Sequence, residues 1–363
     1  MTERDVRDCP NIHFERRGRL GVVTLDRPRA LNALTREMVE ALSAMLARWR
    51  HDTTLGAVLV KAVPGRAFCA GGDVRAVVET AGRDGIDAAH SFFTEEYRLN
   101  WRVRRFPKPY ISLLDGIVMG GGVGISVHGS HRIVTENTLF AMPETAIGMF
   151  PDVGASFVLP RLPGELGTWL GLTGARLDGA HCRAAGIGTH FVDAARLDAL
   201  TDALVDGLGD GVDDGVCDRV LASYDEPSKG ATPFAERAAI DRHLAAPDLP
   251  ELVAHLDDRD DPFVVTLKDR LAPMSPIAVA ITLRQLRRGA GADFDTCMRM
   301  EHGLVRHVLE HGDFAEGVRA LLVDKDKRPR WRHASLEAVT RADIDLFFDD
   351  VPASGLDLHW DIG

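Results

Sequence analysis

A cluster of glycines directly after an apolar run constrains this chain more than any other feature of its sequence. Residues 110–114 (YISLL) end at the Asp115–Gly116 pair, which is typical of a buried strand followed by a turn. The cluster comes next, at Gly120, Gly121, Gly122 and Gly124, and residues 125–128 can continue a helix. Glycines between a strand and a helix start let backbone N–H groups approach a ligand, at the positive end of a helix dipole. The sequence therefore predicts a site built on backbone donors.

A second glycine turn occurs earlier, at residues 70–73 (AGGD), again after a short apolar run. For the cluster at residues 120–124 alone, close packing of a helix on a sheet is an equally good explanation. Two glycine turns at two strand ends, however, can aim two N–H groups at one point, which is the geometry of an oxyanion hole. The second turn therefore favours a catalytic role for both.

Two carboxylates follow the glycine cluster, each on a turn stiffened by proline. Glu144 lies in MPET and Asp152 in FPDVG. Glu144 could also be a solvated turn carboxylate, and Asp152 could be the N-cap of a helix that starts near Val153. Glu95 and Glu96 lie on a predicted helix over residues 88–105, where at least one of them is expected to be exposed. Backbone donors beside carboxylates indicate chemistry on a carbonyl group.

Composition excludes several classes of protein. The chain is 45% hydrophobic and 27% charged, as in ordinary globular proteins, and its net charge of -11 argues against a general nucleic-acid binder. Five cysteines form no CxxC pair and leave an odd count, so reduced thiols and a cytoplasmic location are expected. No apolar stretch approaches the roughly 20 residues that span a bilayer, so no membrane partner is expected. Residues 1–19 resemble neither a signal peptide nor a transit peptide.

Other site motifs fail on spacing. A dinucleotide-binding G-x-G-x-x-G that starts at Gly120 would need glycine where Ile125 stands, and no P-loop pattern occurs. The serine-hydrolase pattern G-x-S-x-G also fails, because residues 124–128 (GISVH) end in His128 where the pattern needs its last glycine. His128 and His131 could face one metal ion, but no third ligand is evident, so no metal site is predicted. The basic stretch at residues 101–108 could meet phosphates or simply be a solvated helix end.

Strand and helix patterns divide the chain into two parts. Strands are predicted at residues 12–16, 20–25 and 56–63, with a helix over residues 34–50 that Thr35 caps. This alternation favours a parallel or mixed sheet covered by helices. After Val192 only helices are predicted, at residues 194–208, 212–223, 233–245, 276–288 and 293–311. The prediction is an α/β core over residues 1–200 and a mainly helical region over residues 201–363, packed on the core, with a solvated acidic loop at residues 257–261.

Three segments resemble the crotonase (enoyl-CoA hydratase/isomerase) superfamily. They are residues 27–34 (RPRALNAL), residues 67–73 (AFCAGGD) and the block at residues 110–154. The closer resemblance is to the branch that hydrolyses 3-hydroxyisobutyryl-CoA, and it rests on the motifs at residues 92–97 (FFTEEY), 120–129, 140–154, 313–320 and 324–326. The resemblance covers nearly the whole chain. It implies an α/β fold, a crotonase-like spiral of ββα units with a helical C-terminal region, that binds acyl-coenzyme A.

The resemblance also implies roles for individual residues. Matched by motif, the two oxyanion N–H groups belong to Gly72 and Gly121, and Glu144 is the catalytic glutamate. Asp152 and Glu96 match residues that line the acyl pocket of the hydrolase branch. Two further residues fall where the family contacts the CoA moiety, namely Arg29 and Ala30.

One departure from the family pattern separates its branches. Hydratases carry a second catalytic glutamate two residues after the glycine triplet, where this chain has Gly124. Paired-glutamate addition of water is therefore disfavoured. A carboxylate at Asp152, where hydratases typically have glycine, suits binding of a substrate hydroxyl. The sequence predicts an acyl-CoA thioester hydrolase in which Glu144 is either a general base or a nucleophile that forms an anhydride.

The implied chemistry needs no metal or redox cofactor, and its implied setting is the breakdown of valine. Two alternatives stay open at this point. One is a hydratase, isomerase or hydrolase acting on a different acyl-CoA, and the other is an inert acyl-CoA-binding member, because a fold does not fix a function. The family forms trimers and larger assemblies, so a homo-oligomer is a further option.

Overall fold

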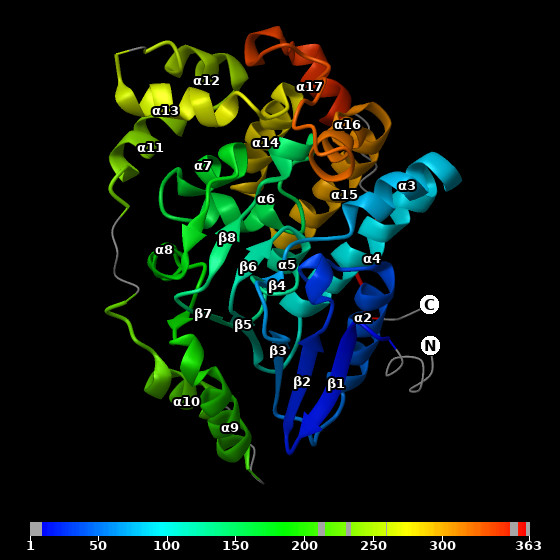
Figure 1. The fold of residues 1–363 in the computed structure, drawn as a ribbon, viewed down its shortest axis with the longest axis vertical. Coiled ribbons are helices and arrows are strands. Elements are labelled where there is room, and N and C mark those ends of the chain that lie inside the picture. The colour runs from blue at the N-terminus through cyan, green and yellow to red at the C-terminus, as the bar shows by residue number, and fades with distance from the viewer. Residues whose placement is uncertain (1–8, 210–214, 230–233, 259, 349–354, 361–363) are drawn as a thin grey trace.

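Two sheets form the centre of the computed structural model, which describes residues 9–209, 215–229, 234–258, 260–348 and 355–360 (Figure 1). The large sheet has the strand order β1-β2-β3-β5-β7-β10 and the small sheet the order β4-β6-β8-β9. The strands of the large sheet are β1 (Ile12–Arg17), β2 (Leu20–Leu25), β3 (Ala57–Ala62), β5 (Tyr110–Leu114), β7 (His131–Val134) and β10 (His190–Phe191). Those of the small sheet are β4 (Ala67–Cys69), β6 (Ile117–Met119), β8 (Leu139–Ala141) and β9 (Leu177–Asp178).

Successive strands alternate between the two sheets. In each of the pairs β3–β4, β5–β6 and β7–β8, the first strand joins the large sheet and the second joins the small one. Neighbouring strands are parallel except at β1–β2 and β8–β9, which are antiparallel. This threefold repetition confirms the predicted spiral and brings the ends of β4, β6 and β8 to one edge of the small sheet.

Helices of the α/β part cover one face of the large sheet. The helix α2 (Arg36–Trp49) begins after Thr35, whose side chain accepts a hydrogen bond from the Met38 N–H, so the predicted N-cap is confirmed. Helix α2 packs against α4 (Ile86–Arg104), and α4 packs against α3 (Val74–Asp84). Their buried side chains share one hydrophobic cluster with the strands.

The other face of the large sheet is covered from the C-terminal part of the chain. The helices α9 (Leu197–Leu208) and α10 (Val216–Tyr224) pair with each other below the sheet (Figure 1). Their apolar residues form a second cluster with the strand side chains of that face, including Leu20, Leu59 and Ile111 from the sheet and Leu204 and Leu221 from the helices.

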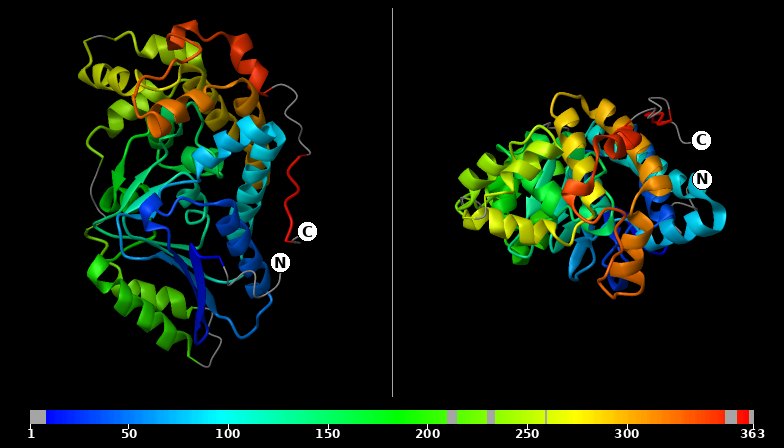
Figure 2. Two further views of the ribbon diagram at one scale, coloured as in Figure 1. Left: turned by 45° about the vertical axis from the view of Figure 1, so that its right-hand side comes forward. Right: turned by 90° about the horizontal axis from the view of Figure 1, so that it is seen from above.

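The remaining helices gather at the opposite end of the molecule, over the small sheet (Figures 1 and 2). They are α11 (Arg237–Leu244), α12 (Leu249–His255), α13 (Pro262–Leu271), α14 (Pro276–Gly289), α15 (Phe294–His311), α16 (Phe314–Val318) and α17 (Arg341–Phe348). Between them and the core lie the short helices α6 (Ala155–Val158) and α7 (Leu166–Thr173). None of the helices in the described ranges has the length and apolarity needed to cross a membrane.

Most predicted elements are confirmed within a few residues, and the described part of the chain has no strand after residue 192. The start of the helix predicted at residues 212–223 lies outside the described residues. The prediction missed α12, α13 and α17. It also treated residues 257–261 as a plain loop, whereas the Asp261 side chain accepts a hydrogen bond from the Phe263 N–H and caps α13; residue 259 is outside the described residues. The division of the chain at residue 200 stays a prediction.

Candidate active site

The two glycine turns predicted from the sequence lie against each other. Because β4 and β6 pair in parallel, the turns that follow them leave the small sheet at the same edge. A Cβ atom added to Gly121 would lie 3.1 Å from the backbone nitrogen of Gly72. In the part of the chain that the structure describes, neither of these two N–H groups donates a hydrogen bond. Two unpaired backbone donors therefore lie close together, as an oxyanion hole requires.

Backbone conformation at these turns requires glycine. Gly120 has φ 47° and ψ -122°, and Gly71 has φ 127°, which are conformations that residues with a side chain rarely adopt. At Gly121 the limit is space, because an added Cβ would lie 2.5 Å from Glu96 Oε1. Residues without a side chain are thus needed in both of the turns that carry the N–H donors.

The helix expected after the cluster is much shorter than predicted. Helix α5 (Gly121–Gly124) has a single turn, and residues 125–128 form a further turn in place of the predicted helical continuation. Three of its four residues are glycine, the residue with the poorest helix propensity after proline. The Ser126 hydroxyl also donates to the Gly122 carbonyl oxygen at 2.6 Å. The predicted assistance from a helix dipole is therefore wrong, and the donors are those of the turn itself.

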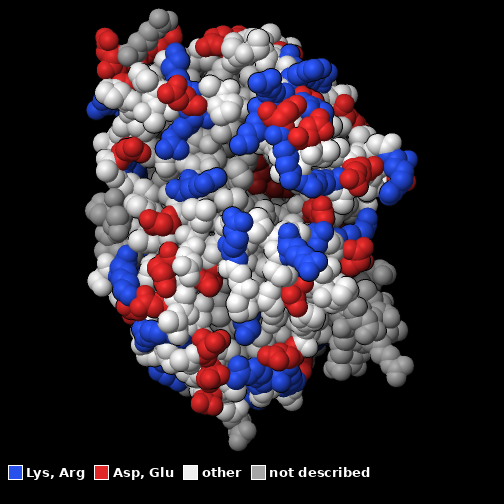
Figure 3. All heavy atoms as spheres, viewed as in Figure 1, with Lys and Arg blue, Asp and Glu red and all other residues white. Residues whose placement is uncertain are grey.

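Three carboxylates are buried around this turn. Glu96 comes from α4, Glu144 from the 3-10 helix η2 (Glu144–Ile147), and Asp152 from the segment after it, with residue exposures of 2%, 7% and 5%. A Cβ atom added to Gly120 would lie 3.1 Å from Glu144 Oε1. Glu144 is thus not a solvated turn residue. In the space-filling view, a hollow with Asp or Glu atoms in its floor opens between α5 and α16 (Figure 3).

Burial governs the ionisation of these carboxyl groups. Burial, followed by the charge of Asp152, raises the pKa of Glu96 and of Glu144 well above the usual value. Burial also raises the pKa of Asp152 to about 7, against the hydrogen bond from Tyr97, which lowers it. Glu96 Oε1 and Glu144 Oε2 have no hydrogen-bond partner in the described structure. Buried acceptors without partners, with perturbed pKa values, are typical of a functional site.

Asp152 does not cap a helix. Helix α6 begins after Gly154, and no side chain caps it. The Asp152 carboxylate instead accepts a hydrogen bond of 2.8 Å from the Tyr97 hydroxyl group. Tyr97 lies on α4, next to Glu96, so α4 contributes two neighbouring side chains to the site.

Sequence reasoning missed Glu301, which holds the Asp152 turn from α15. Its fully buried carboxylate accepts hydrogen bonds from the Gly154 N–H at 2.7 Å and from the Ser156 N–H at 2.8 Å and hydroxyl group at 2.5 Å. The turn needs such support because Val153 has φ 53°, a strained value for a β-branched residue. Gln285 of α14 adds a hydrogen bond to the Pro151 carbonyl oxygen. No local sequence signal marks either residue.

Packing leaves no room for a side chain at Gly124. A Cβ atom added there would lie 2.6 Å from Asn100 Nδ2 and 2.8 Å from the Cβ of Val153. Asn100 is on α4 and Val153 follows Asp152. A glutamate at residue 124 is therefore incompatible with the conformation that presents Asp152.

Arg29 and Ala30 lie on the 3-10 helix η1 (Pro28–Ala30), beside the first glycine turn. The Ala70 N–H donates to the Leu31 carbonyl oxygen at 3.0 Å, which fixes the segment against that turn. The Arg29 side chain is exposed and Ala30 is half-buried. Their contact with the CoA moiety stays a prediction.

The structure does not bring His128 and His131 together. His128 is buried with Nε2 2.6 Å from the Val153 carbonyl oxygen, and burial lowers its pKa to about 4. His131 Nε2 is 2.8 Å from Asp218 Oδ1 on α10. Each ring therefore has a structural partner of its own.

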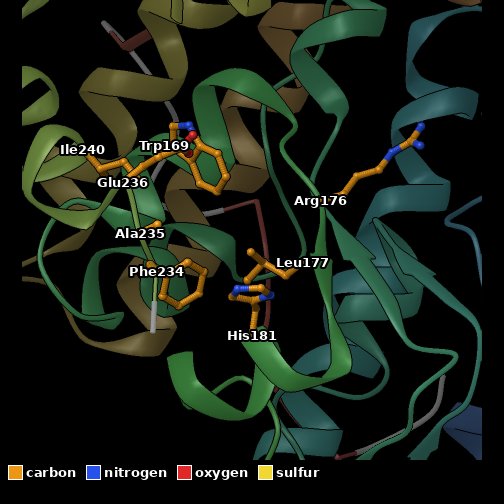
Figure 4. A pocket seen from close by; sticks show the side chains of 8 residues that line it. All are labelled: Trp169, Arg176, Leu177, His181, Phe234, Ala235, Glu236 and Ile240. Carbon is orange, nitrogen blue, oxygen red and sulfur yellow. The ribbon is translucent and has the colours of Figure 1, made fainter. Parts of the chain in front are cut away.

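A separate cavity of about 240 Å³ lies away from these carboxylates, among α7, α8 (Gly179–Ala185) and α11. The rings of His181 and Phe234 are 4.9 Å apart there. Figure 4 shows its lining residues, Trp169, Arg176, Leu177, His181, Phe234, Ala235, Glu236 and Ile240. None of the predicted site residues is among them.

A protein-family model described as Enoyl-CoA hydratase/isomerase matches residues 20–348. The chain belongs to this family. Among solved structures, an enoyl-CoA hydratase from Rhodobacter sphaeroides 2.4.1 is 38% identical, with a TM-score of 0.84 over 93% of this chain and 97% of that one. A carnitinyl-CoA dehydratase from Mycobacterium thermoresistibile is 37% identical, with a TM-score of 0.84 over 95% of this chain and 99% of that one.

Relatives named 3-hydroxyisobutyryl-CoA hydrolase are also similar to this chain over nearly its whole length. A mitochondrial 3-hydroxyisobutyryl-CoA hydrolase of Danio rerio is 42% identical over 352 residues, which are 96% of this chain and 91% of the relative. The protein with that name in Homo sapiens is 41% identical over 95% of this chain and 90% of the relative. The expected cytoplasmic location is overturned by these mitochondrial relatives. The expectation rested on five thiols, all of which are free and buried, and reduced thiols alone do not specify a compartment.

Proposed function

We propose that the protein hydrolyses the thioester of 3-hydroxyisobutyryl-CoA, or of a close 3-hydroxyacyl-CoA, to the free acid and coenzyme A. The observation that carries this proposal is the set of buried carboxylates beside two unpaired backbone N–H groups. The lack of space for a second glutamate at Gly124 argues against paired-glutamate hydration. The relatives named 3-hydroxyisobutyryl-CoA hydrolase support the choice of substrate.

In the proposed mechanism, the thioester oxygen accepts hydrogen bonds from the N–H groups of Gly72 and Gly121. These donors stabilise the negative charge that forms on this oxygen in the tetrahedral intermediate. Glu144 removes a proton from water as the water oxygen attacks the carbonyl carbon, or its carboxylate attacks that carbon and water cleaves the resulting anhydride. In both routes the carbon–sulfur bond breaks, and the CoA thiolate takes up a proton.

The acyl group is recognised by the remaining carboxylates in this proposal. Asp152 accepts a hydrogen bond from the substrate 3-hydroxyl group, and the unpartnered Glu96 Oε1 lines the same pocket. Arg29 and Ala30 contact the CoA moiety. Water and the residues of this chain are sufficient for the reaction, so the proposal includes no metal or redox cofactor. The setting that we propose for the reaction is the breakdown of valine.

Thiol release from 3-hydroxyisobutyryl-CoA tests the proposed function. The expected result is rapid release of free CoA, with little loss of the enoyl absorbance of crotonyl-CoA in a parallel reaction. Two similar structures are named as a hydratase and a dehydratase, which makes enoyl-CoA hydration the second candidate. Fast hydration of crotonyl-CoA without thiol release would replace the first proposal by the second. Tight binding of both esters without reaction would indicate an inert acyl-CoA-binding member.

A further inference from the structure

Three side chains that can bind a metal ion converge at the C-terminal end of α15, and we call them the histidine cluster. They are His307, Glu310 and His311, in the order His-Val-Leu-Glu-His. One ligand atom from each residue lies within 4.8 Å of the ligand atoms of the other two. In the part of the chain that the structure describes, no other group of three histidine, cysteine, aspartate or glutamate side chains converges in this way.

The helix itself brings the three side chains together. Residues three and four apart lie on one face of an α-helix, so His307, Glu310 and His311 project to the same side. The two histidine rings are nearly parallel, with their centroids 6.2 Å apart and their planes at 26°. A class of zinc peptidases has the same order of residues on a helix, with both histidines bound to the ion. Because such an order can arise by chance, the inference rests on the convergence of the three ligand atoms.

The Glu310 carboxylate is oriented by a neighbouring cation. Its Oε1 atom pairs with Arg306 Nε at 3.1 Å, and the Arg306 guanidinium group also pairs with Asp87 on α4 at 2.6 Å. The other carboxylate oxygen, Oε2, lies 3.7 Å from His311 Nε2. A partner that orients a ligand without touching the ion is typical of metal sites. Arg306 therefore holds one oxygen of Glu310, and the second oxygen faces the histidines.

Charge at this end of α15 favours a cation. The helix has 18 residues and ends at His311, where its dipole places a partial negative charge. The whole chain has a net charge of -11, which attracts cations. Asp87 offsets the positive charge of Arg306, the cation that lies next to the cluster.

The types of ligand select the ion. Two imidazoles and a carboxylate suit zinc and its neighbours among the transition metals, whereas magnesium and calcium prefer oxygen ligands alone. Zinc binds histidine and carboxylate at about 2.0–2.2 Å with four ligands, so a tetrahedral site needs ligand atoms about 3.3 Å apart. None of the three side chains in the cluster is buried, so rotation about their side-chain bonds can close the remaining distance.

From this arrangement we propose that the histidine cluster binds one Zn²⁺ ion through His307, Glu310 and His311, with water as the fourth ligand. The proposal goes beyond the proposed function, because none of these residues has a part in thioester hydrolysis. The cluster begins six residues after Glu301, which is about 9 Å along a helix. Since the ligands converge only when α15 is formed, the ion binds the folded chain in preference to the unfolded chain and stabilises it.

Zinc titration of the full-length protein, prepared without a histidine tag and stripped of metal, tests the proposal. Calorimetry is expected to show one Zn²⁺ ion bound per chain, with Kd in the micromolar range, and no binding of Mg²⁺. His307→Gln and His311→Gln each remove one imidazole, so Kd should rise at least about 10-fold. Saturating Zn²⁺ should raise the urea midpoint of wild type and have little effect on that of either variant.

Matched variants separate the histidine cluster from adventitious binding of zinc. His51→Gln removes an exposed histidine outside the cluster and should leave Kd unchanged. If His307→Gln does not fold, His311→Gln carries the test, because the His311 side chain is 42% exposed. The electron paramagnetic resonance spectrum of bound Cu²⁺ should show nitrogen couplings from imidazole in wild type, and His311→Gln should weaken them.

Two outcomes would overturn the zinc site. One is a Kd for zinc that is unchanged in His311→Gln, and the other is no binding by wild type at millimolar zinc. Neither outcome affects the release of thiol from 3-hydroxyisobutyryl-CoA, so the zinc site and the proposed function can fail separately.

Discussion

Glu144 is the carboxylate on which both proposed routes depend. Glu144→Gln keeps the size and burial of the side chain but removes its capacity to accept a proton or to attack. Hydrolysis is expected to fall on the order of 10²–10⁴-fold, the usual range for lost acid–base catalysis, while the CoA ester still binds. Glu95→Gln is the control, because Glu95 is the neighbour of Glu96 in the sequence and its carboxylate pairs with Arg98 at 2.7 Å. Wild-type turnover by Glu144→Gln would exclude Glu144 from the mechanism.

Asp152 decides between related substrates in the proposed site. The hydrogen bond from the substrate hydroxyl compensates the buried carboxylate for its lost hydration. An analogue that lacks the hydroxyl cannot provide this compensation. Wild type is therefore expected to prefer 3-hydroxyisobutyryl-CoA over isobutyryl-CoA by orders of magnitude in kcat/KM. In Asp152→Ala the gap should narrow, chiefly through lost activity on the hydroxylated ester. An unchanged preference in a folded variant would remove the hydroxyl-binding role.

The pKa of Asp152 makes this recognition depend on pH. A carboxyl group with a pKa of about 7 is protonated below that pH, so it loses acceptor strength as pH falls. We expect kcat/KM for the hydroxylated ester to rise with pH through about 7. Tyr97→Phe removes the hydrogen bond that lowers this pKa, so the midpoint should move to higher pH. A midpoint that stays fixed, measured by pH profiles of both enzymes, would assign this titration to another group.

At the scale of elements, α15 acts on the site through a single side chain. Glu301→Gln cannot accept all the hydrogen bonds from Gly154 and Ser156, which leaves a buried donor unpaired. We expect the free energy of unfolding to fall by about 1–3 kcal/mol. Activity on the hydroxylated ester should fall more than activity on isobutyryl-CoA, because the turn that presents Asp152 is loosened.

Glu310 is exposed on the same helix, and Glu310→Gln is the control for Glu301→Gln, with both variants compared in the presence of a metal chelator. Urea unfolding measures the stability of both variants, and kcat/KM for the two esters measures their selectivity. Equal losses of activity on both esters would show that Glu301 supports the fold in general and has no particular effect at Asp152.

Elements with local signals were predictable from the sequence. The Thr35 cap begins α2 as expected, since its hydrogen bond spans three residues. The strand at Tyr110–Leu114 and the two glycine turns were found from apolar runs that end in glycine. Glu144 and Asp152 were found because a motif of 15 residues, 140–154, carries both. Each of these signals lies within one short stretch of chain.

Features that depend on tertiary contacts were not predictable. Glu301 contacts Gly154, which is 147 residues earlier, and nothing near Glu301 in the sequence indicates this. The positive φ of Val153 has no local cause either, because it is enforced by α14 and α15. The single-turn length of α5 depends on its glycines, a signal that was present in the sequence but was outweighed by the apolar residues that follow.

At the scale of the whole molecule, the α/β part and most of the C-terminal helices share a core. One hydrophobic cluster extends from Val23 in the large sheet to Ile277 of α14 and Met298 of α15. The hydrogen bonds from the Gly154 N–H to Glu301 and from the Ser275 N–H to the Thr145 carbonyl oxygen cross the same boundary. The C-terminal helices therefore complete the site, and we infer that the two parts unfold together.

The buried carboxyl groups make the stability of the whole molecule depend on pH. A carboxyl group whose pKa is raised on folding stabilises the folded state below its unfolded pKa, and this contribution is lost as pH rises through the folded pKa. Burial raises the pKa of Asp152 to about 7 and that of Glu301 to about 8. The pKa of buried His128 is lowered to about 4, so its contribution to stability is lost as pH falls. This contribution changes mainly below pH 6.5.

Between pH 7 and pH 8 the folded protein therefore holds more protons than the unfolded chain. The free energy of unfolding, measured with urea, should fall by about 1–3 kcal/mol over this interval, since each proton contributes about 1.4 kcal/mol per pH unit at most. Asp152→Asn keeps the shape of the side chain and removes one titrating group, so its decline should be shallower. A free energy that is constant or rises between these pH values would contradict the raised pKa values of Asp152 and Glu301.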